Sequence, residues 1–410
     1  MKVLVAGAGL AGLSAAWNLV KAGHQPVVFE AKDRVGGRSF SHTFENGASV
    51  ELGGEYVFPD YFAIRRLGAE LQIPIISHGV SFFRRQTNGT RLSVPELLET
   101  RNRLAQTLAA MIADGQSRVS ALQLFREVCG EGYEDDPVYR QNVTALQADP
   151  GRLSAEALIG TGMTTTDGYV EDGGRFLGGN QSVANELARR MGPLVRLETP
   201  VVGVSQTATS VEFELGDGRR EVGDAAIVAV PLPLLRTLSM DFEWTERQRQ
   251  ALDHRDMSVG WKFGAMLEEG TDLGGVGVQS SEIFAWSWQS LSRDGETRQP
   301  ALSGVGGTPE TYRDVDPAAG PAGYIASLQR DRPGLTLIGE PRFQDWAADP
   351  WTQGSYSLPN LDWEPSDDQA FDELSGRVAL AGEHTKLATL SYAVETGWRA
   401  ADLVGELEHR

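Results

Sequence analysis

Three glycines near the start of the chain have the spacing of a loop that binds phosphate groups. Gly7, Gly9 and Gly12 form the pattern G-x-G-x-x-G directly after a short apolar run that predicts a strand. The first glycine permits a tight turn, the second lets a pyrophosphate approach the backbone, and the third lets the following helix pack closely on the strand. The N-terminus of that helix favours negative charge. The pattern predicts a dinucleotide site, with Leu10 and Ala11 among its binding residues.

The elements that must position this loop follow it in register. Apolar side chains recur at helical spacing over residues 13–20, Gly23 is a stop signal, and residues 27–29 predict a second strand. Glu30 ends that strand about 20 residues beyond the loop, where a carboxylate suits the two hydroxyls of a ribose. Glu30 and its neighbour Ala31 are therefore predicted to bind the cofactor.

A second glycine turn decides which dinucleotide is expected. Gly36, Gly37 and Arg38 follow Glu30 closely. Paired glycines let backbone amides approach a ligand, and an arginine can pair with a diphosphate. A nicotinamide-binding domain has no use for such a turn here. The stretch resembles the extended FAD fingerprint of the flavin-containing amine oxidase superfamily, which includes monoamine, polyamine and L-amino acid oxidases.

The resemblance extends along the chain, through residues 50–61, 175–190, 197–235, 343–357 and 376–404. It implies bound FAD and further cofactor contacts. The segment at 50–61 would pass beside the flavin ring, the segment near 202 would meet the adenine, and the last segment would meet the pyrophosphate, the ribityl chain and the pyrimidine. The implied residues are Gly53, Gly54, Glu55, Val202, Trp346, Gly382, Glu383, Ala393 and Val394.

The fold class expected from these segments is α/β. A Rossmann-like FAD-binding domain of the glutathione reductase type would be interleaved with an α+β substrate-binding domain. A chain of 410 residues is long enough for two domains. Asp217-Gly218 predicts a hairpin turn between two alternating strands. The expected FAD-binding pieces are residues 1–80, 170–240 and 335–410, and the expected substrate-binding pieces are residues 81–169 and 241–334.

Three residues are the candidates for catalysis. Lys262 stands in the apolar run "VGWKFGAML", which predicts a buried strand. Burying an unpaired lysine costs folding free energy, so a functional role would explain why it is there. The resemblance gives one, since Lys262 matches a lysine that holds a water at flavin N5 and assists reaction with oxygen. An edge-strand lysine facing solvent is the alternative. Tyr356 matches one wall of an aromatic cage around the amine, although a core tyrosine would read the same. Glu55 would repel a carboxylate and attract an ammonium.

The chain departs from its relatives at three places. Ser355 stands where covalent flavoenzymes carry cysteine, so the FAD should be non-covalent. The second cage aromatic has no clear counterpart, although Tyr392 or Leu387 could take up the space. The arginine that clamps a carboxylate in amino acid oxidases is absent beside Tyr56, although Arg84 or Arg85 could supply one. Further substrate candidates are Trp286 and Trp288, which alternate with Phe284 on one strand face and could equally be core.

Composition narrows the classes of partner. The net charge of −19 excludes a basic footprint for nucleic acid, and it would favour the approach of cationic small molecules. No apolar run has the length of a membrane span and no signal peptide precedes the first strand, so a cytoplasmic protein is expected. Cys129 is the only cysteine, and the six histidines lack metal spacing, so we expect no metal site and interpret the histidines as structural or solvent-facing. A homodimer is one option for the assembly.

The leading hypothesis is an FAD-dependent oxidase of a small-molecule amine. Removal of a hydride equivalent from the carbon that bears a neutral amine would give an imine, which hydrolyses to an aldehyde or ketone, while dioxygen would be reduced to hydrogen peroxide. The alternatives are an L-amino acid oxidase, a flavin desaturase of a biosynthetic intermediate, and a flavin-bound protein without turnover.

Overall fold

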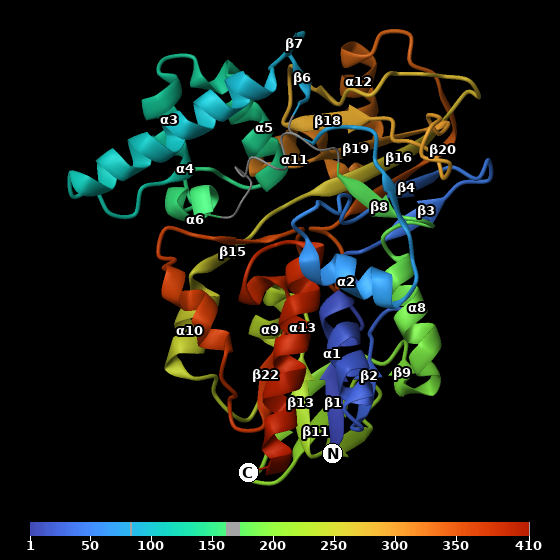
Figure 1. Cartoon of the computed structure of the whole chain (residues 1–410), viewed down its shortest axis with the longest axis vertical. Helices are drawn as coiled ribbons and strands as arrows, with labels where there is room; N and C mark the ends of the chain where they lie inside the picture. The colour runs from blue at the N-terminus through green and yellow to red at the C-terminus, as the bar shows by residue number, and fades with distance from the viewer. Residues whose placement is uncertain (83, 161–172, 410) are drawn as a thin grey trace.

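A computed structural model gives the structure of residues 1–82, 84–160 and 173–409. Its glycine loop is built on a five-stranded parallel sheet, in the lower half of Figure 1. The central strands are apolar and buried on both faces, as a parallel sheet between two layers requires. In order across the sheet, the strands are β22 (Val378–Leu380), β13 (Ala225–Val228), β1 (Lys2–Ala6), β2 (Gln25–Phe29) and β9 (Val195–Arg196).

Helices cover one face of this sheet. The helix after the glycine loop, α1 (Leu10–Lys21), packs against the closing helix α13 (Leu390–Gly405), and both termini of the chain lie at the same end (Figure 1). The crossing is close because Gly397 has no side chain: a Cβ there would lie 2.2 Å from the carbonyl oxygen of Ala11. Two further helices complete the layer, α2 (Phe62–Glu70) and α8 (Ser182–Met191).

A second sheet covers the other face. Its apolar side chains, such as Phe213, pack against Leu4 and Phe29 of the parallel sheet. The strand order is β12 (Arg220–Gly223), β11 (Val211–Leu215), β10 (Val201–Gln206) and β14 (Ser239–Met240). The short helices α9 (Leu232–Thr237) and α10 (Glu246–Asp253) follow in the chain.

A seven-stranded, largely antiparallel sheet forms the upper half of the molecule (Figure 1). Its strand β16 carries Lys262 between the fully buried Trp261 and Phe263. The order is β20 (Leu337–Asp345), β16 (Trp261–Leu267), β19 (Ala301–Gly306), β18 (Ala285–Trp288), β17 (Val278–Gln279), β6 (Gln86–Thr87) and β7 (Thr90–Arg91). Helices α11 (Pro309–Val315) and α12 (Ala322–Asp331) pack on it.

A helical layer with its own apolar core lies beside this sheet. Its helices begin at side-chain caps, with Ser93, Ser120 and Asp136 accepting hydrogen bonds from the first backbone amides. The helices are α3 (Val94–Ala113), α4 (Ala121–Cys129), α5 (Pro137–Leu146) and α6 (Ala155–Gly160).

Short elements join the two halves. Three two-stranded ladders pair β3 (Ser41–Thr43) with β4 (Ser49–Glu51), β5 (Ile75–Ser77) with β8 (Gly174–Phe176), and β15 (Arg255–Met257) with β21 (Ser357–Pro359). The 3₁₀ turns are η1 (Tyr133–Asp135), η2 (Gly192–Leu194), η3 (Pro317–Ala319), η4 (Pro365–Phe371), η5 (Glu383–Thr385) and η6 (Glu406–His409).

The predicted fold class is confirmed, with a Rossmann-like parallel sheet and a second, mainly antiparallel sheet. The hairpin at Asp217-Gly218 joins β11 to β12, and Lys262 lies on a buried strand. Strand β20 joins the upper sheet although its residues fall in the range expected for the FAD-binding domain. The domain ranges themselves stay a prediction.

Candidate active site

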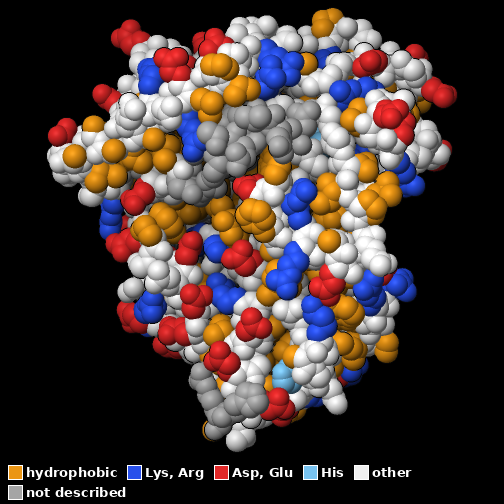
Figure 2. Space-filling model, in the orientation of Figure 1, with side chains coloured by type: hydrophobic (Ala, Val, Ile, Leu, Met, Phe, Trp, Pro, Cys, Tyr) orange, Lys and Arg blue, Asp and Glu red, His pale blue; other side chains and the backbone are white. Residues whose placement is uncertain are grey.

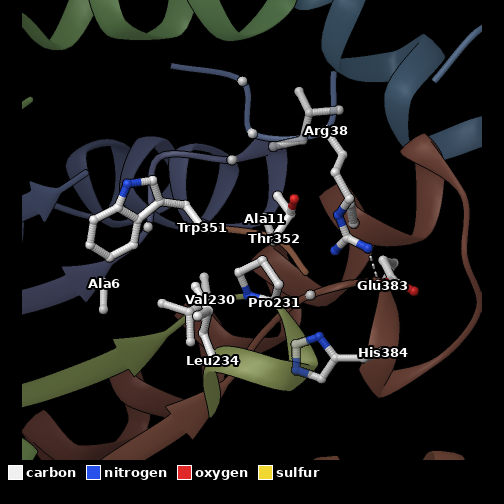
Figure 3. Close-up of a pocket in the computed structure, with 18 of the residues that line it drawn as sticks. Ala6, Ala11, Arg38, Val230, Pro231, Leu234, Trp351, Thr352, Glu383 and His384 are labelled. Carbon is white, nitrogen blue, oxygen red and sulfur yellow. Dashed lines mark hydrogen bonds and ion pairs between the residues drawn. The ribbon is translucent and has the colours of Figure 1, made fainter. Parts of the chain in front are cut away.

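A cavity of about 370 Å³ opens at the carboxyl ends of β1 and β2. Figure 3 shows the side chains around it, with Arg38 and Glu383 on one side and Val230, Pro231 and Leu234 on another. Most residues of both glycine turns line it, together with residues from β10 and the segment after β22. The sheet edge at the carboxyl ends of parallel strands is where open α/β folds bind ligands.

The three glycines of the first loop are needed for three different reasons. Gly7 has a φ of +98°, and a Cβ there would lie 2.8 Å from the carbonyl oxygen of Ala229. A Cβ at Gly12 would lie 2.0 Å from the carbonyl oxygen of Gly7, so this glycine is required for packing. A Cβ at Gly9 would meet nothing within 4 Å, although Gly9 lines the cavity. Gly9 therefore leaves open a cradle that a side chain would fill.

Two polar features surround that cradle. No side chain caps α1, so its first backbone amides have no side-chain acceptor from the Gly9 position. The Glu30 carboxylate is held at the end of β2, because the amides of Ala8 and Lys32 donate to it at 2.7 and 3.0 Å. Burial raises the pKa of Glu30 above its ordinary value. The loop thus presents free donors to an anion and one fixed acceptor to a hydroxyl.

Arg38 connects the second glycine turn to the far wall of the cavity. Its Nη1 donates to the carbonyl oxygen of Ser355 at 2.8 Å and to Glu383 Oε1 at 2.7 Å (Figure 3). Glu383 also accepts from the hydroxyl of Ser357 at 2.6 Å. Burial is the largest single influence and would raise the pKa of Glu383, but the charge of Arg38 and the hydrogen bonds from Ser357 and Arg38 act together with smaller contributions to bring the pKa below its ordinary value. This ion pair joins segments far apart in the chain.

His384 is a buried polar side chain of this cavity that lacks a hydrogen-bond partner among the described residues. It is 1% exposed, and among the described residues neither ring nitrogen has a hydrogen-bond partner. Burial lowers its pKa to about 4, so the ring is neutral. Burying an imidazole without hydrogen-bond partners costs folding free energy, unless a bound ligand supplies those partners. Together with the Gly9 cradle and the amides at the start of α1, the unpartnered His384 fits a cavity that holds a phosphate-bearing dinucleotide.

The two glycines Gly9 and Gly12 give a matched test of this fit. Gly9 has a φ of −71°, which any residue adopts, so Gly9→Val should fold normally yet fill the cradle. We expect an affinity for FAD about 10- to 100-fold lower, corresponding to roughly 1–3 kcal/mol of overpacking. Gly12→Ala should instead lower the stability of the apoprotein. Flavin content and thermal unfolding of the apoproteins measure the two effects. A Gly9→Val protein with full flavin content would contradict the assignment.

A second cavity of about 500 Å³ adjoins the first. Gly54, Tyr356 and the segment Ala388–Leu390 line both, so the two spaces meet there. Its wall is largely aromatic and aliphatic. The aromatic lining residues are Tyr56, Phe58, Tyr61, Phe62, Phe82, Trp286, Trp288, Tyr356 and Tyr392.

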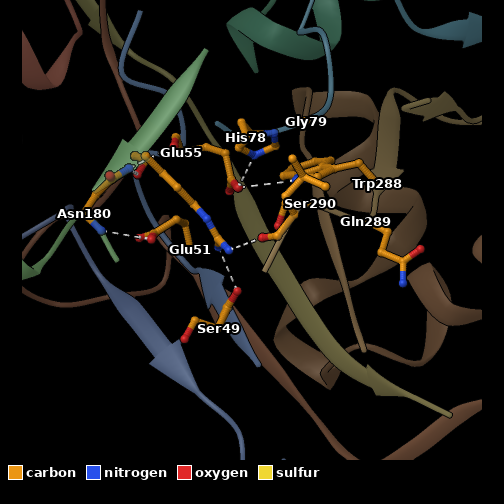
Figure 4. Close-up of polar contacts among 12 residues, drawn as sticks. Ser49, Glu51, Glu55, His78, Gly79, Asn180, Trp288, Gln289 and Ser290 are labelled. Carbon is orange, nitrogen blue, oxygen red and sulfur yellow. Dashed lines mark hydrogen bonds and ion pairs between the residues drawn. The ribbon is translucent and has the colours of Figure 1, made fainter. Parts of the chain in front are cut away.

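A buried ionic network lies in the wall of the second cavity, which Glu55 and Lys262 both line. Lys262 Nζ lies 2.6 Å from Glu55 Oε2, and both side chains are 8% exposed. The other oxygen, Glu55 Oε1, lies 2.8 Å from His78 Nε2 and 3.3 Å from Trp288 Nε1 (Figure 4). Burial alone would raise the pKa of Glu55, but the charge of Lys262 and the hydrogen bond from His78 lower it to about 2. Glu55 is therefore ionised and fully engaged.

A second buried carboxyl lies next to this network. Glu51 accepts a hydrogen bond from the hydroxyl of Ser41 at 2.6 Å. It also accepts one from the amide of Asn180 at 2.9 Å (Figure 4). Asn180 also donates through its side chain to the carbonyl oxygen of Glu55 at 2.8 Å. Burial and the charge of Glu55 raise the pKa of Glu51 to about 7. Asn180 thus fixes the backbone that carries Glu55.

Tryptophans and a buried arginine stiffen the aromatic wall. The rings of Trp286 and Trp288 lie 4.1 Å apart. Behind them the Arg85 guanidinium lies 4.0 Å from the Trp286 ring and 4.6 Å from the Phe82 ring. Burial lowers the pKa of Arg85 to about 9, and its donors reach the neutral acceptors Phe82 O, Gln141 O and Gln279 Oε1. Arg85 therefore supports the wall without lining the cavity.

The structure brings most of the predicted site residues together. The first cavity is lined by Gly7, Gly9, Leu10, Ala11, Glu30, Ala31, Gly36, Gly37, Arg38, Gly54, Val202, Gly382, Glu383 and Ala393. The second is lined by Gly53, Gly54, Glu55, Tyr56, Lys262, Trp286, Trp288, Tyr356 and Tyr392.

Five predicted residues line neither cavity: Gly12, Arg84, Arg85, Trp346 and Val394. Trp346 is buried and donates to the carbonyl oxygen of Leu52 at 2.8 Å, while Val394 accepts from Ser14 on α1. Phe284 lies just before β18 and packs against the core of the helical layer. The functional roles given to all these residues stay predictions.

Three residues at the site carried no usable signal in the sequence. His78 and Asn180 stand in short irregular segments, and their hydrogen-bond partners come from other parts of the fold. His384 stands in the 3₁₀ turn η5. The histidines had been interpreted as structural or solvent-facing, yet both are buried beside a cavity. Among the described residues, no group of three or more metal-ligating side chains is present, and no helix has the length and apolar content to cross a membrane.

Comparison with known proteins identifies the family. The sequence matches the flavin containing amine oxidoreductases over residues 10–405. The chain belongs to this family. It is 30% identical over 261 residues to a flavin-containing amine oxidase of Oncorhynchus mykiss, covering 56% of the chain and 50% of that relative. The chain thus spans about half the length of that relative. Over 437 residues it is 23% identical to the nicotine dehydrogenase of Pseudomonas putida, and the match covers 99% of this chain and 88% of that relative.

Other relatives agree. The putrescine oxidase of Kocuria rosea is 27% identical over 327 residues, 68% of each chain. A solved putrescine oxidase bound to putrescine superposes with a TM-score of 0.79 at 22% identity, over 100% of both chains. The solved cyclohexylamine oxidase from Brevibacterium oxydans IH-35A superposes with a TM-score of 0.81 at 19% identity, over 100% of this chain and 99% of the other. The structural likenesses show the shared fold.

Family membership makes the chain a flavoprotein, and its cofactor is FAD. The first cavity suits that group, since it combines the Gly9 cradle, the uncapped start of α1 and the unpartnered His384. Glu30 would face the ribose end, and Arg38 with Glu383 would lie toward the second cavity.

Proposed function

We propose that the protein is an FAD-dependent oxidase of a small-molecule monoamine whose nitrogen is attached to an apolar body. In the overall reaction, R₂CH–NH₂ and O₂ give R₂C=NH and H₂O₂, and water then converts the imine to a carbonyl compound and ammonia. Bound FAD supplies the chemistry that accepts two electrons from the amine and passes them to dioxygen. The FAD is held without a cysteine link, since Cys129 is the only cysteine and lines neither cavity.

The second cavity supports this choice of substrate class through its charges. Lys262 is the only cation among the described residues that line it. Its carboxylates are Glu55, which is engaged by Lys262 and His78, Glu395, which pairs with Lys386, and the exposed Asp60. Within the part of the chain that the structure describes, the buried lining therefore offers no free carboxylate to a second ammonium and no arginine to a carboxylate. This observation carries the proposal of a monoamine.

The aromatic wall suits the body and the nitrogen of such a substrate. Tyr356 lines both cavities, so its ring stands where the amine would meet the cofactor site. An aromatic face attracts a cationic amine and orients its approach. Burial raises the pKa of Tyr356 to about 12, so the phenol stays neutral. The low polarity of the cavity also disfavours a charged ammonium, which would leave the amine in its neutral form.

A substrate panel under anaerobic conditions tests the proposal. Benzylamine or cyclohexylamine should bleach the bound flavin at least about tenfold faster than putrescine, because one free ammonium would stay buried without a partner. Phenylalanine should be equally poor, since no arginine lines the cavity among the described residues. Faster bleaching by phenylalanine would favour an amino acid oxidase, and faster bleaching by putrescine would overturn the monoamine class.

A further inference from the structure

The Glu55 carboxylate is occupied by protein donors before any substrate arrives. Lys262 reaches one oxygen, and His78 and Trp288 reach the other, at 2.6, 2.8 and 3.3 Å. These four side chains are buried. They come from β16, β18, the segment after β4 and the segment after β5. A group held this completely by the protein is poorly placed to receive a substrate ammonium.

The hydrogen-bond geometry fixes the protonation of the network. Because Glu55 is ionised, it can only accept, so His78 must donate from Nε2. Burial lowers the pKa of His78, which keeps the ring neutral. The neutral Nε2–H tautomer leaves Nδ1 without a proton, and His78 Nδ1 has no partner among the described residues. Among the residues that the structure describes, Glu55 is the one anion that pairs with Lys262.

We propose that Glu55, oriented by His78 and Trp288, is a positioning residue that holds Lys262 as a fixed ammonium beside the junction of the two cavities. The proposal rests on the oxidase function given above, and it assigns Glu55 to the lysine in place of the substrate. Without the carboxylate, Lys262 would face the Trp288 ring at 4.7 Å and otherwise lie on a buried strand. A ring face compensates a buried ammonium only in part, so the lysine would lose its proton near neutral pH.

Other titratable groups face this network and must be separated from it. Glu51 and Arg175 act on it from β4 and β8, and Tyr356, which lines the same cavity, interacts electrostatically with Glu55. Of these, Glu51 is the group with a pKa of about 7. Its contribution has to be removed before a step near neutral pH is assigned to Lys262.

The test is the pH dependence of Glu55→Gln. Between about pH 6 and about pH 9, its rate constant for reaction of the reduced enzyme with oxygen should fall by about tenfold per unit above the new pKa of Lys262, the response of one titrating group. The visible spectrum of the oxidised, bound flavin should shift with the same midpoint. The dissociation constant of the amine, measured at one pH, should change by less than about twofold. Wild-type protein should lack this step.

Three variants control the result. The step should persist in Glu51→Gln/Glu55→Gln, which removes the other nearby titrating carboxyl, and it should vanish in Glu55→Gln/Lys262→Met, which has no lysine to titrate. Glu55→Asp should restore the wild-type profile. Asp367→Asn, which weakens a partly buried pair with His254 outside both cavities, should leave the profile unchanged.

Two outcomes would overturn the proposal. One is a Glu55→Gln protein whose rate profile and flavin spectrum match wild type. The other is an amine dissociation constant about tenfold weaker with no new pH step, which would make Glu55 the receptor of the substrate ammonium. The spectral titration needs no turnover, so it judges the role of Glu55 even if no amine reduces the flavin, a result that would refute the oxidase function alone.

Discussion

Lys262→Met should slow the reaction of the reduced enzyme with dioxygen by about 10²- to 10³-fold, the range found when one preorganised charge or donor is removed from an active site. The ammonium of Lys262 lines the second cavity and is fixed by Glu55 at 2.6 Å. A fixed positive charge in a dry cavity stabilises the negative charge that develops when oxygen is reduced. Anaerobic reduction by the amine should slow far less. Stopped-flow measurement of the two half-reactions separates these effects.

Lys21→Met is the matched control for this experiment. Lys21 pairs with Glu70 on the helical face of the parallel sheet, at 3.0 Å and with its side chain 40% exposed. Removing this surface ammonium should leave both half-reactions unchanged. If Lys262→Met reacts with oxygen as fast as wild type, the lysine has no part in that step and the alternative of a purely structural lysine holds.

Arg38→Met should both destabilise the fold and remove the flavin. Arg38 is the cation paired with Glu383, whose side chain is 9% exposed, and its loss leaves that carboxylate buried without a counter-charge. Breaking a buried pair in this way costs about 3–5 kcal/mol; Arg38 is itself 21% exposed, so we expect about 3 kcal/mol. Chemical denaturation of the apoprotein measures the stability, and absorbance after gel filtration measures the flavin content.

The pH dependence of Arg38→Met has a definite sign. In wild type the pKa of Glu383 lies below its ordinary value. The ion pair therefore stabilises the fold fully at pH values above the ordinary pKa of a glutamate, and this stabilisation is lost as the pH falls through the lower pKa of the folded protein. Without Arg38 the folded pKa of Glu383 rises, and the gain at neutral pH should disappear. Glu383→Gln in the same chain should recover part of the stability but not the flavin. Full flavin binding by Arg38→Met would contradict the role of Arg38 in the cofactor cavity.

Local signals in the sequence predicted the framework of the site. The G-x-G-x-x-G loop, the acid that ends β2 and the second glycine turn each depend on neighbouring residues, and all of them meet at one cavity. Lys262 was predictable as a buried residue because apolar residues flank it on its own strand. The hairpin at Asp217-Gly218 is likewise a short-range signal.

The network around Lys262 could not be predicted in the same way. Glu55 and His78 are 23 residues apart, and Glu55 and Lys262 are 207 apart. No periodicity connects them, since Glu55 follows β4, His78 follows β5 and Lys262 lies on β16, and these strands belong to three different sheets. From sequence, Glu55 was expected to attract a substrate ammonium because its protein partners were invisible. In the structure the same carboxylate is already bonded to Lys262, His78 and Trp288, and this changes which role we propose for it.

The oxidase function is tested by one experiment on purified, FAD-loaded protein. A hydrophobic monoamine such as benzylamine is added without oxygen, and oxygen is then admitted while hydrogen peroxide is measured. We expect the flavin absorbance to be lost with the amine and to return with oxygen, and one molecule of peroxide to form for each amine oxidised. Flavin that no amine of a broad panel bleaches, or that is reoxidised without peroxide, would contradict the assignment.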